Sequence, residues 1–311
     1  MKTTLFHKAS HLAVLFVLSL APALFAQEQQ VQIQTSHVRG GVYMLAGVGG
    51  NVAVFPGEDG VLVVDAGMPE YSQGILDEIE GITEEAGFQP EIRYLINTHW
   101  HFDHVGGNAA FARTGATLAA HEGVVHLVSE DQVMESLDDR AVEALPPEGR
   151  PTLSFNDRMN LQCNGDLIHV VHMPGAHSNG DVIVHFRDAD IIHLGDIFFN
   201  GMYPFIDVDN EGNIDGMVRA VEEVLTHSRP TTLFIPGHGE LADREALEAY
   251  GAMLRTVRDR VQGMIEEGLG RDAIIAAGPS AEFDAAWGGD QGFRVPEAWV
   301  GLVYDGMVRN R

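Results

Sequence analysis

The sequence has only one cysteine, Cys163, and few basic residues among its 311 positions. A single thiol cannot form an internal disulfide, so we expect Cys163 to be a small core residue or an inert thiol. Lysine and arginine number 19 against 45 acidic residues, which gives a formal net charge of −26. Such a surface repels phosphate backbones and offers no basic stripe, so no nucleic-acid partner is expected. By default the acidic surface is a solubility or salt adaptation.

The chain also lacks an apolar run of the roughly 20 residues that a membrane span requires. Lys2 and Lys8 precede an apolar stretch, residues 11–26, which a proline interrupts and which ends in small residues. This order is typical of a cleaved signal peptide, and an uncleaved anchor helix fits the flanking residues less well. We therefore expect cleavage after Ala26 and a periplasmic or secreted protein with no membrane contact. The mature chain would carry 17 basic and 45 acidic residues.

Histidine and aspartate, by contrast, occur at spacings typical of metal ligands. The candidate ligands lie in separated segments and are His99, His101, Asp103, His104, His177, Asp196 and His238. Imidazole and carboxylate suit a borderline cation such as zinc, and two such ions about 3.5–4 Å apart share and activate a hydroxide. Seven ligands are enough for two ions, so the pattern predicts a metal-dependent hydrolase.

The first of these segments, residues 97–108, follows an apolar run, residues 92–96, that is typical of a buried strand. Four ligands within six residues cannot share one helical face, where only neighbours three or four apart meet. A loop at the end of the strand is therefore expected to carry them. Gly106 and Gly107 permit a tight backbone path into a short helix over residues 108–113.

These motifs resemble those of the metallo-β-lactamase superfamily, and the resemblance covers most of the chain after the leader. The family pattern His-x-His-x-Asp-His matches residues 99–104, and its Pro-Gly-x-His turn matches residues 174–177. The Gly-Asp pair after a strand matches residues 195–196, and Pro-Gly-His-Gly matches residues 236–239. The early Val-Asp-x-Gly turn matches residues 64–67. No expected ligand position is empty.

The resemblance implies two adjacent divalent ions, expected to be Zn²⁺, with separate ligand sets. The first set would be His99, His101 and His177, the second Asp103, His104 and His238, with Asp196 bridging both ions. A water between two cations loses its proton near neutral pH and becomes the attacking hydroxide. Asp103 would also face this water, so it is the expected catalytic residue that orients it and accepts a proton.

Other histidines and one further aspartate are expected to have supporting roles. Asp65 is expected to brace a loop, because metal-bound imidazoles need an outer hydrogen-bond partner. His121 is expected to cap a helix. The histidines in strand-like runs are expected to be structural or to support the ligands, and these are His169, His172, His185 and His193.

The chain differs from some members of this superfamily at ligand positions, and these differences limit the reactions that are expected of it. Sequence-typical clinical β-lactamases have Cys or Ser where this chain has Asp196, which disfavours a dedicated lactamase. Flavodiiron proteins have Glu where His101 stands, which disfavours a redox di-iron site. A bridging aspartate is instead shared with glyoxalase II-type thioesterases, lactonases and phosphodiesterases, so the reaction class is better defined than the substrate.

The predicted fold is α/β (α+β), a four-layer αβ/βα sandwich of the metallo-β-lactamase type, in a single domain over residues 27–311. The expected strands are residues 41–45, 52–55, 61–64, 92–96, 117–120, 167–171, 182–186, 191–194 and 232–235. The expected helices are residues 70–85 and 215–225, followed by 243–267 and 296–308 within a C-terminal helical part, residues 243–311, that packs on the sandwich. Ligands are expected on loops at strand ends.

Two regions are candidates for substrate selection. Residues 129–151 lack strong periodicity and are interpreted as a lid near the mouth of the site. The aromatic run after Asp196 is either ordinary core or the lining of an apolar pocket. Within that run, Phe199 and Tyr203 are the predicted pocket residues.

Together these features predict an exported dinuclear-zinc hydrolase that opens a small amide, lactone or ester, with β-lactam-like substrates included. The alternatives are a small-molecule phosphodiesterase and a metal-bound periplasmic accessory protein without turnover. The sequence does not define the natural substrate, the native metal among zinc, manganese and iron, or the oligomeric state.

Overall fold

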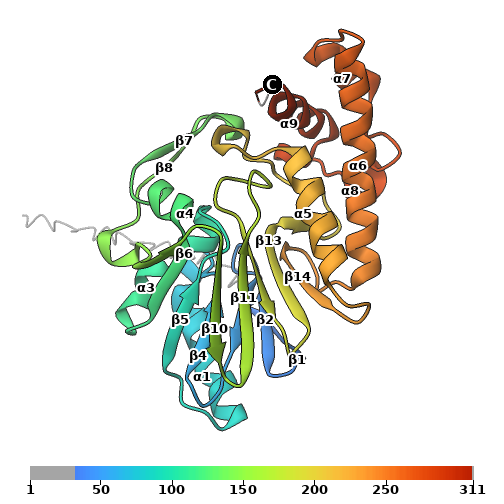
Figure 1. Ribbon diagram of the computed structural model, residues 1–311. Helices are drawn as coiled ribbons and strands as arrows, with labels where there is room; N and C mark the ends of the chain where they lie inside the picture. The colour runs from blue at the N-terminus through green and yellow to red at the C-terminus, as the bar shows by residue number, and fades with distance from the viewer. Residues whose placement is uncertain (1–31, 310–311) are drawn as a thin grey trace, which may run out of the picture. The chain divides into compact units, whose positions relative to one another are not determined.

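Two β-sheets form the centre of the protein in a computed structural model that describes residues 32–309 (Figure 1). The predicted signal peptide, residues 1–26, lies outside the described residues. The first sheet has the order β1-β2-β3-β4-β5-β6-β9 and the second the order β10-β11-β12-β13-β14. Strands β1 to β4 pair antiparallel, whereas β4, β5, β6 and β9 run parallel; in the second sheet only β13 and β14 are parallel.

The strands of the first sheet are β1 Gln34–Arg39, β2 Val42–Ala46, β3 Val52–Phe55, β4 Val61–Val64, β5 Ile92–Ile96, β6 Thr117–His121 and β9 Leu153–Phe155. Those of the second are β10 Arg158–Cys163, β11 Asp166–His172, β12 Val182–Phe186, β13 Ile191–Phe199 and β14 Leu233–His238. A separate hairpin consists of β7 Gln132–Met134 and β8 Arg140–Val142.

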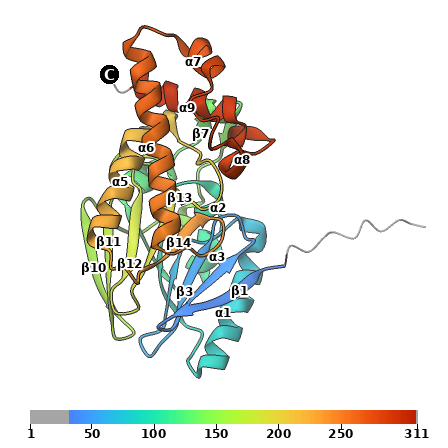
Figure 2. The ribbon, with the colours of Figure 1, turned by 90° about the vertical axis from the view of Figure 1, so that its right-hand side faces the viewer.

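Helices cover the outer face of each sheet, which completes the four layers predicted from the sequence (Figure 2). The first sheet is covered by α1 Ser72–Ala86 and α3 Asn108–Arg113. On the second, α5 Ile214–His227 packs against β13, and α6 Arg244–Glu266 packs against α5 and β14. The last helix, α9 Pro296–Arg309, packs against α5 and α6.

The remaining helical segments are short. They are α2 Phe102–Val105, α4 Glu122–Leu127, α7 Arg271–Ala277 and α8 Asp284–Trp287, with 3-10 turns η1 Pro69–Tyr71, η2 Glu135–Leu137, η3 Pro147–Gly149, η4 Val208–Asn210 and η5 Gly292–Arg294. Within residues 32–309, no helix has both the length and the apolarity needed to cross a membrane.

The apolar core between the sheets explains why several strands are continuous hydrophobic runs. All residues of β3, β4 and β13 are buried, because neighbouring layers cover both faces of these strands. Cys163 belongs to this core and is buried, as expected. Burial also raises the pKa of its thiol to about 11, which is the behaviour of an inert cysteine.

Parallel pairing brings the functional segments to one edge of the sandwich. Strands β4 and β5 end next to each other in the first sheet, and β13 and β14 do so in the second. The segments that follow Val64 and Ile96 therefore face Asp196 and His238 across the gap between the sheets. This edge is the place where the predicted ligands meet.

Candidate metal centre

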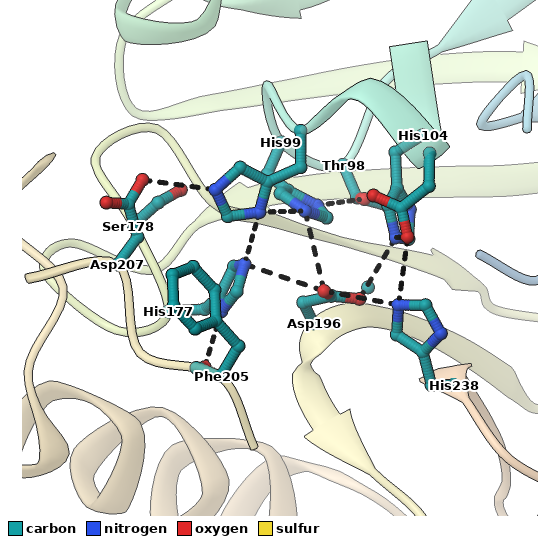
Figure 3. Close-up of polar contacts among 12 residues, drawn as sticks. Thr98, His99, His104, His177, Ser178, Asp196, Phe205, Asp207 and His238 are labelled. Carbon is teal, nitrogen blue, oxygen red and sulfur yellow. Dashed lines mark hydrogen bonds and ion pairs between the residues drawn. The ribbon is translucent and has the colours of Figure 1, made fainter. Parts of the chain in front are cut away.

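The structure brings all seven predicted ligands together in two adjoining groups (Figure 3). Within each group, the candidate ligand atoms lie within 4.8 Å of one another. The first group consists of His99, His101, His177 and Asp196, and the second of Asp103, His104 and His238. This division agrees with the ligand sets that the resemblance implies. Their role as metal ligands stays a prediction.

Three imidazole nitrogens converge in the first group, and none of the three carries a proton. Nδ1 of His101 lies 3.1 Å from Nε2 of His99 and 2.8 Å from Nε2 of His177. The opposite nitrogen of His177 lies 2.9 Å from the carbonyl oxygen of Phe205, which only accepts, so Nδ1 of His177 carries the proton. Its Nε2 therefore presents a lone pair to the centre.

The other two rings have the same protonation pattern. Nε2 of His101 lies 3.1 Å from the carboxylate of Asp207, to which it donates. Thr98 Oγ1 donates to Asp65 Oδ2 at 2.7 Å, so it accepts from Nδ1 of His99 at 3.0 Å. All three inner nitrogens are thus unprotonated acceptors that face one another. A divalent cation at their centre fits this donor set.

Two buried polar atoms face each other without bonding where the second group adjoins Asp196 of the first. Nε2 of His104 and Oδ1 of Asp196 lie 3.1 Å apart, and neither has a hydrogen-bond partner. His104 uses its other nitrogen to donate to Asp65 at 2.7 Å. Nε2 of His238 lies 3.2 Å from Asp103 and 3.4 Å from Asp196. A second cation fits between the two unpaired atoms, Nε2 of His104 and Oδ1 of Asp196.

The pKa values of the histidines are shifted in opposite directions in the two groups. Burial lowers the pKa of His99, with nearby histidines adding to the effect, and burial lowers the pKa of His177 to about 4. Burial also acts on His238, but the carboxylates of Asp196 and Asp103 outweigh it and raise the pKa of His238 to about 9. Burial acts on His104 too, but the carboxylates of Asp196, Asp103 and Asp65 outweigh it and raise the pKa of His104 well above its usual value. The first group therefore disfavours protons, and the second binds protons that a cation would displace.

The two carboxylates of the cluster are ionised at neutral pH. Burial opposes this, but His104 and His238 hold the pKa of Asp103 at about 2. The same two rings, with His99, hold the pKa of Asp196 well below its usual range. Both groups are therefore available as anionic ligands.

The location of the ligands corrects the expectation that all of them lie on loops. Asp103 and His104 are in the single turn of helix α2, where His101 is the preceding residue. Asp196 lies inside β13, and His238 is the last residue of β14. The strand β13 extends beyond the predicted residues 191–194 because it continues to pair with β14 as far as Phe199 and His238.

Close approach of backbone segments to the ligands requires glycine at particular positions. A side chain at Gly237 would overlap the carboxylate of Asp196, and one at Gly50 would overlap the ring of His104. Gly195 has a positive φ of 51°, next to the irregular register that precedes Asp196. These residues let the backbone pass close to the ligands without blocking them.

The predicted supporting residues have the expected contacts. Asp65 accepts from the backbone and hydroxyl of Thr98 and from His104, each at 2.7 Å. His121 accepts from the backbone of Gly123 at 3.1 Å and so caps α4. Asp181, for which no role was predicted, accepts from the hydroxyl of Ser178 at 2.6 Å and braces the turn that carries His177. Burial raises the pKa of Asp181 to about 7, although its bonds to Ser178 oppose this.

Asp207 supports a predicted ligand, and its role was not predicted from the sequence. Its carboxylate is fully buried and accepts from Trp100 Nε1 at 2.9 Å as well as from His101. It therefore sets the tautomer and orientation of His101. Asp207 lies just after the aromatic run in an unremarkable segment, so only the buried tryptophan and histidine that need an acceptor could have indicated it.

A cavity of about 380 Å³ opens onto the metal-ligand cluster. Its ligand side is formed by His101, Asp103, Asp196 and His238, and its other lining residues are Phe102, Met134, Leu137, Phe199, Met202, Phe205, Phe293 and Arg294. Apart from Arg294 these are apolar side chains. Met134 and Leu137 come from residues 129–151, the predicted lid, and that region contains the β7–β8 hairpin.

The two predicted pocket residues have different locations. Phe199 lines the cavity and stacks on His238, with ring centroids 5.0 Å apart. Tyr203 does not line it, so the prediction for Tyr203 is wrong. Its ring stacks on Trp299 at 4.0 Å, and its hydroxyl donates to Asp284 at 2.7 Å. The aromatic run turns at this point, which directs Tyr203 to the C-terminal helices instead.

A four-layer sandwich with a histidine and aspartate cluster at the edge of its two sheets is the arrangement of a metal-dependent hydrolase. The metallo-beta-lactamase superfamily model matches residues 45–252. The chain therefore belongs to the metallo-beta-lactamase superfamily and is a metallo-hydrolase.

Two relatives illustrate the sequence similarity. An acyl-coenzyme A thioesterase, MBLAC2 of Homo sapiens, is 28% identical over 210 residues, which cover 60% of this chain and 72% of the relative. An N-acyl homoserine lactonase of a Bacillus species is 33% identical over 214 residues, which cover 58% of this chain and 77% of the relative.

Two solved structures illustrate the fold. A metallo-beta-lactamase from Pontibacter korlensis aligns with a TM-score of 0.58 at 16% identity and covers 72% of this chain and 99% of its own. The sec-alkylsulfatase Pisa1 from a Pseudomonas species aligns with a TM-score of 0.64 at 14% identity and covers 88% of this chain but only 50% of its own. At these identities the likeness concerns the fold.

Proposed function

We propose that this protein is an exported dinuclear-zinc hydrolase that opens the acyl bond of a small amide, lactone or ester with an apolar acyl group. The observation that carries the proposal is the apolar cavity that opens directly onto both groups of the cluster. The two relatives described above are named as a thioesterase and a lactonase, and both names denote cleavage of an ester-type bond.

Seven side chains would hold the two ions: His99, His101 and His177 on one side, Asp103, His104 and His238 on the other, and Asp196 between them. When bound, the ions supply a Lewis acid for the carbonyl oxygen and an acidified water as nucleophile. The converging lone pairs and the two unbonded buried atoms support this assignment.

The chain's own residues supply positioning and proton handling. Asp103 lines the cavity and is ionised, so its carboxylate can orient a water and accept its proton. Phe199, Phe205 and Phe293 form an apolar wall that excludes water and receives the acyl group. Arg294 is the single arginine or lysine of the lining among residues 32–309, and it suits a polar group of the substrate.

Export is part of the proposal and rests on the sequence of residues 1–26. Expression of the full chain in a bacterium, followed by fractionation and N-terminal sequencing, tests it. The expected result is a mature chain in the periplasm or medium that begins at Gln27. An uncleaved chain in the cytosolic fraction would contradict this part.

The enzymatic part is tested by metal content together with turnover on a panel of an acyl lactone, an aryl ester, a thioester, a cephalosporin and an aryl phosphodiester. We expect two zinc ions per chain and fastest cleavage of an acyl ester-type substrate. Fastest cleavage of the phosphodiester would instead support the phosphodiesterase alternative. Two ions with no turnover on any substrate would support the accessory-protein alternative.

A matched pair of histidine variants tests the metal assignment. His177→Ala removes a ligand of the first group and should reduce zinc toward one ion per chain with near-complete loss of turnover. His126→Ala removes an exposed histidine of α4 and should change neither. Unchanged turnover in His177→Ala would refute the assignment of the first group.

A further inference from the structure

A second cavity, of about 400 Å³, lies on the outer face of the second sheet and shares no lining residue with the metal-site cavity. On β11, Ile168 and Val170 face the core between the sheets, so the alternating residues His169 and Val171 face outward. His185 lies directly across from His169 on β12 and faces the same side. The C-terminal part of α5 forms the opposite wall.

The lining of this outer cavity is unusually basic for so acidic a chain. Three of the 19 lysine and arginine residues contribute, and these are Arg158, Arg187 and Arg229. Three histidines, His169, His185 and His227, lie beside them, and Glu223 is the single acidic lining residue in the described part of the chain. The floor is apolar and consists of Val171, Met173, Ile183 and Ile192, and Val224 of α5 faces it from the opposite wall.

Two of the arginines form no direct ion pair, although Arg229 helps to lower the pKa of Asp190. Arg158 is paired with Asp157 at 3.0 Å. Within residues 32–309, no carboxylate oxygen lies within 4.0 Å of the guanidinium of Arg187 or Arg229. The Arg187 guanidinium instead donates to Nδ1 of His169 at 3.3 Å, and Arg187 is half-buried. A partly desolvated guanidinium normally has an anionic partner.

The pKa values of the neighbouring histidines are lowered by the same positive environment. Burial, followed by Arg187 and His169, lowers the pKa of His185 to about 4. Burial and the guanidinium groups of Arg187 and Arg158 lower the pKa of His169. An anion between these groups would relieve their mutual repulsion.

We propose that this cavity is a binding site for a small organic anion, whose carboxylate, sulfonate or phosphate group pairs with Arg187 and Arg229 and whose apolar body lies on the floor of aliphatic side chains. The volume is in the range of small-molecule sites, and the combination of a cationic rim with an apolar floor selects an amphiphilic anion over an inorganic one. The site is separate from the proposed hydrolytic centre, so it stands whatever the substrate of that centre is.

The test is a fluorescence titration of the zinc-loaded mature protein with 2-naphthalenesulfonate, a sulfonate that coordinates metals weakly. We expect saturable binding of one molecule per chain, and at least about tenfold weaker binding of the neutral 2-naphthalenesulfonamide. Each of Arg187→Gln and Arg229→Gln should weaken binding about tenfold by removing one charge-assisted contact. Arg187→Lys keeps the charge and should retain part of the affinity, with hydrolytic turnover unchanged in all three variants.

Two control variants distinguish the outer cavity from other surfaces. Arg113→Gln removes an exposed arginine of α3 and should leave the titration unchanged. Arg294→Gln removes the arginine of the metal-site cavity and should also leave it unchanged. Loss of binding in Arg294→Gln alone, equal binding of the neutral sulfonamide, or absence of saturable binding would each overturn the proposal.

Discussion

Oδ2 of Asp65 lies 2.7 Å from Nδ1 of His104 and also 2.7 Å from Oγ1 of Thr98. Because Thr98 in turn accepts from His99, one buried carboxylate orients a ligand in each half of the cluster. Asp65 has a positive φ of 64°, a conformation that aspartate adopts more readily than most residues. The two predicted metal sites are therefore linked through the turn after β4.

Replacing this carboxylate tests the link. In Asp65→Asn the amide keeps the shape, but an NH2 group replaces one of the two acceptor oxygens. The side chain can then no longer accept from all three donors, which are His104 and the hydroxyl and backbone N–H of Thr98. We expect zinc affinity to fall about 10–100-fold in both sites. Competition with a chromogenic chelator measures this, with Asp77→Asn on the exposed side of α1 as the control. Loss confined to one site would show that the two ligand sets are independently held.

Asp207 supports a different ligand, and its replacement should have a more local effect. Asp207→Asn removes the charge that accepts from both His101 and Trp100. We expect the first ion to bind about 10–100-fold more weakly, with the second less affected. Stability should fall by about 1–3 kcal/mol because a buried donor loses its partner. Chelator competition and urea unfolding measure the two effects.

The control for Asp207 is Asp188→Asn, which changes an exposed aspartate. It should alter neither zinc affinity nor the unfolding midpoint. Wild-type affinity for both ions in Asp207→Asn would mean that packing alone holds His101 in place.

Phe293 tests the apolar wall of the metal-site cavity. Its ring lies 5.5 Å from that of Phe205 and 6.2 Å from that of Phe199, measured between centroids. Phe293→Ala should raise KM about tenfold for substrates with a long apolar acyl group and leave kcat nearly unchanged, because it removes binding that ground and transition states share. Val308→Ala, at an exposed apolar residue of α9, is the control. A fall in kcat with constant KM would place Phe293 in the chemical step.

A pair of stacked histidines predicts how stability depends on pH. His172 stacks on His121 with ring centroids 3.8 Å apart, and burial, followed by His121, lowers the pKa of His172 to about 4. The ordinary value is about 6.5. The unfolded chain therefore binds the extra proton first, so this contribution to stability is complete above pH 6.5 and is lost as the pH falls toward 4.

His172→Phe should keep the stacked ring but remove this proton-binding group. We expect a smaller drop in Tm between pH 7 and pH 4.5 than in the parent protein, whereas His126→Gln at an exposed position should follow the parent curve. Thermal unfolding at a series of pH values provides the measurement. Parallel curves for His172→Phe and the parent would contradict the prediction.

The fold was largely predictable because its core strands are short apolar runs bounded by turns. Strands β3, β4, β5 and β12 and helix α3 have the predicted bounds. Strands β1, β9 and β10 were not predicted. They lie at sheet edges, where residues are largely exposed and the apolar alternation is weak.

The site residues that belong to short sequence motifs were predictable, whereas those that tertiary packing brings to the site were not. The ligand motifs are local in sequence, so the grouping of seven residues could be proposed before their positions were known. Asp207 and Arg294 belong to no motif, and each reaches the site through tertiary contacts. Tyr203 shows the converse, because its aromatic character gave no information about which side of the chain it faces.

Phe293 and Arg294, which line the cavity beside the ligands, lie beyond residue 252, where the match to the superfamily ends. In the proposed function, part of the wall that contacts a substrate therefore comes from a different region of the chain than the segments that carry the ligands. Mutation or exchange of residues beyond 252 can therefore change which substrates enter the cavity without changing the predicted metal ligands. In evolutionary terms, this separation lets substrate preference diverge while the reaction centre stays constant.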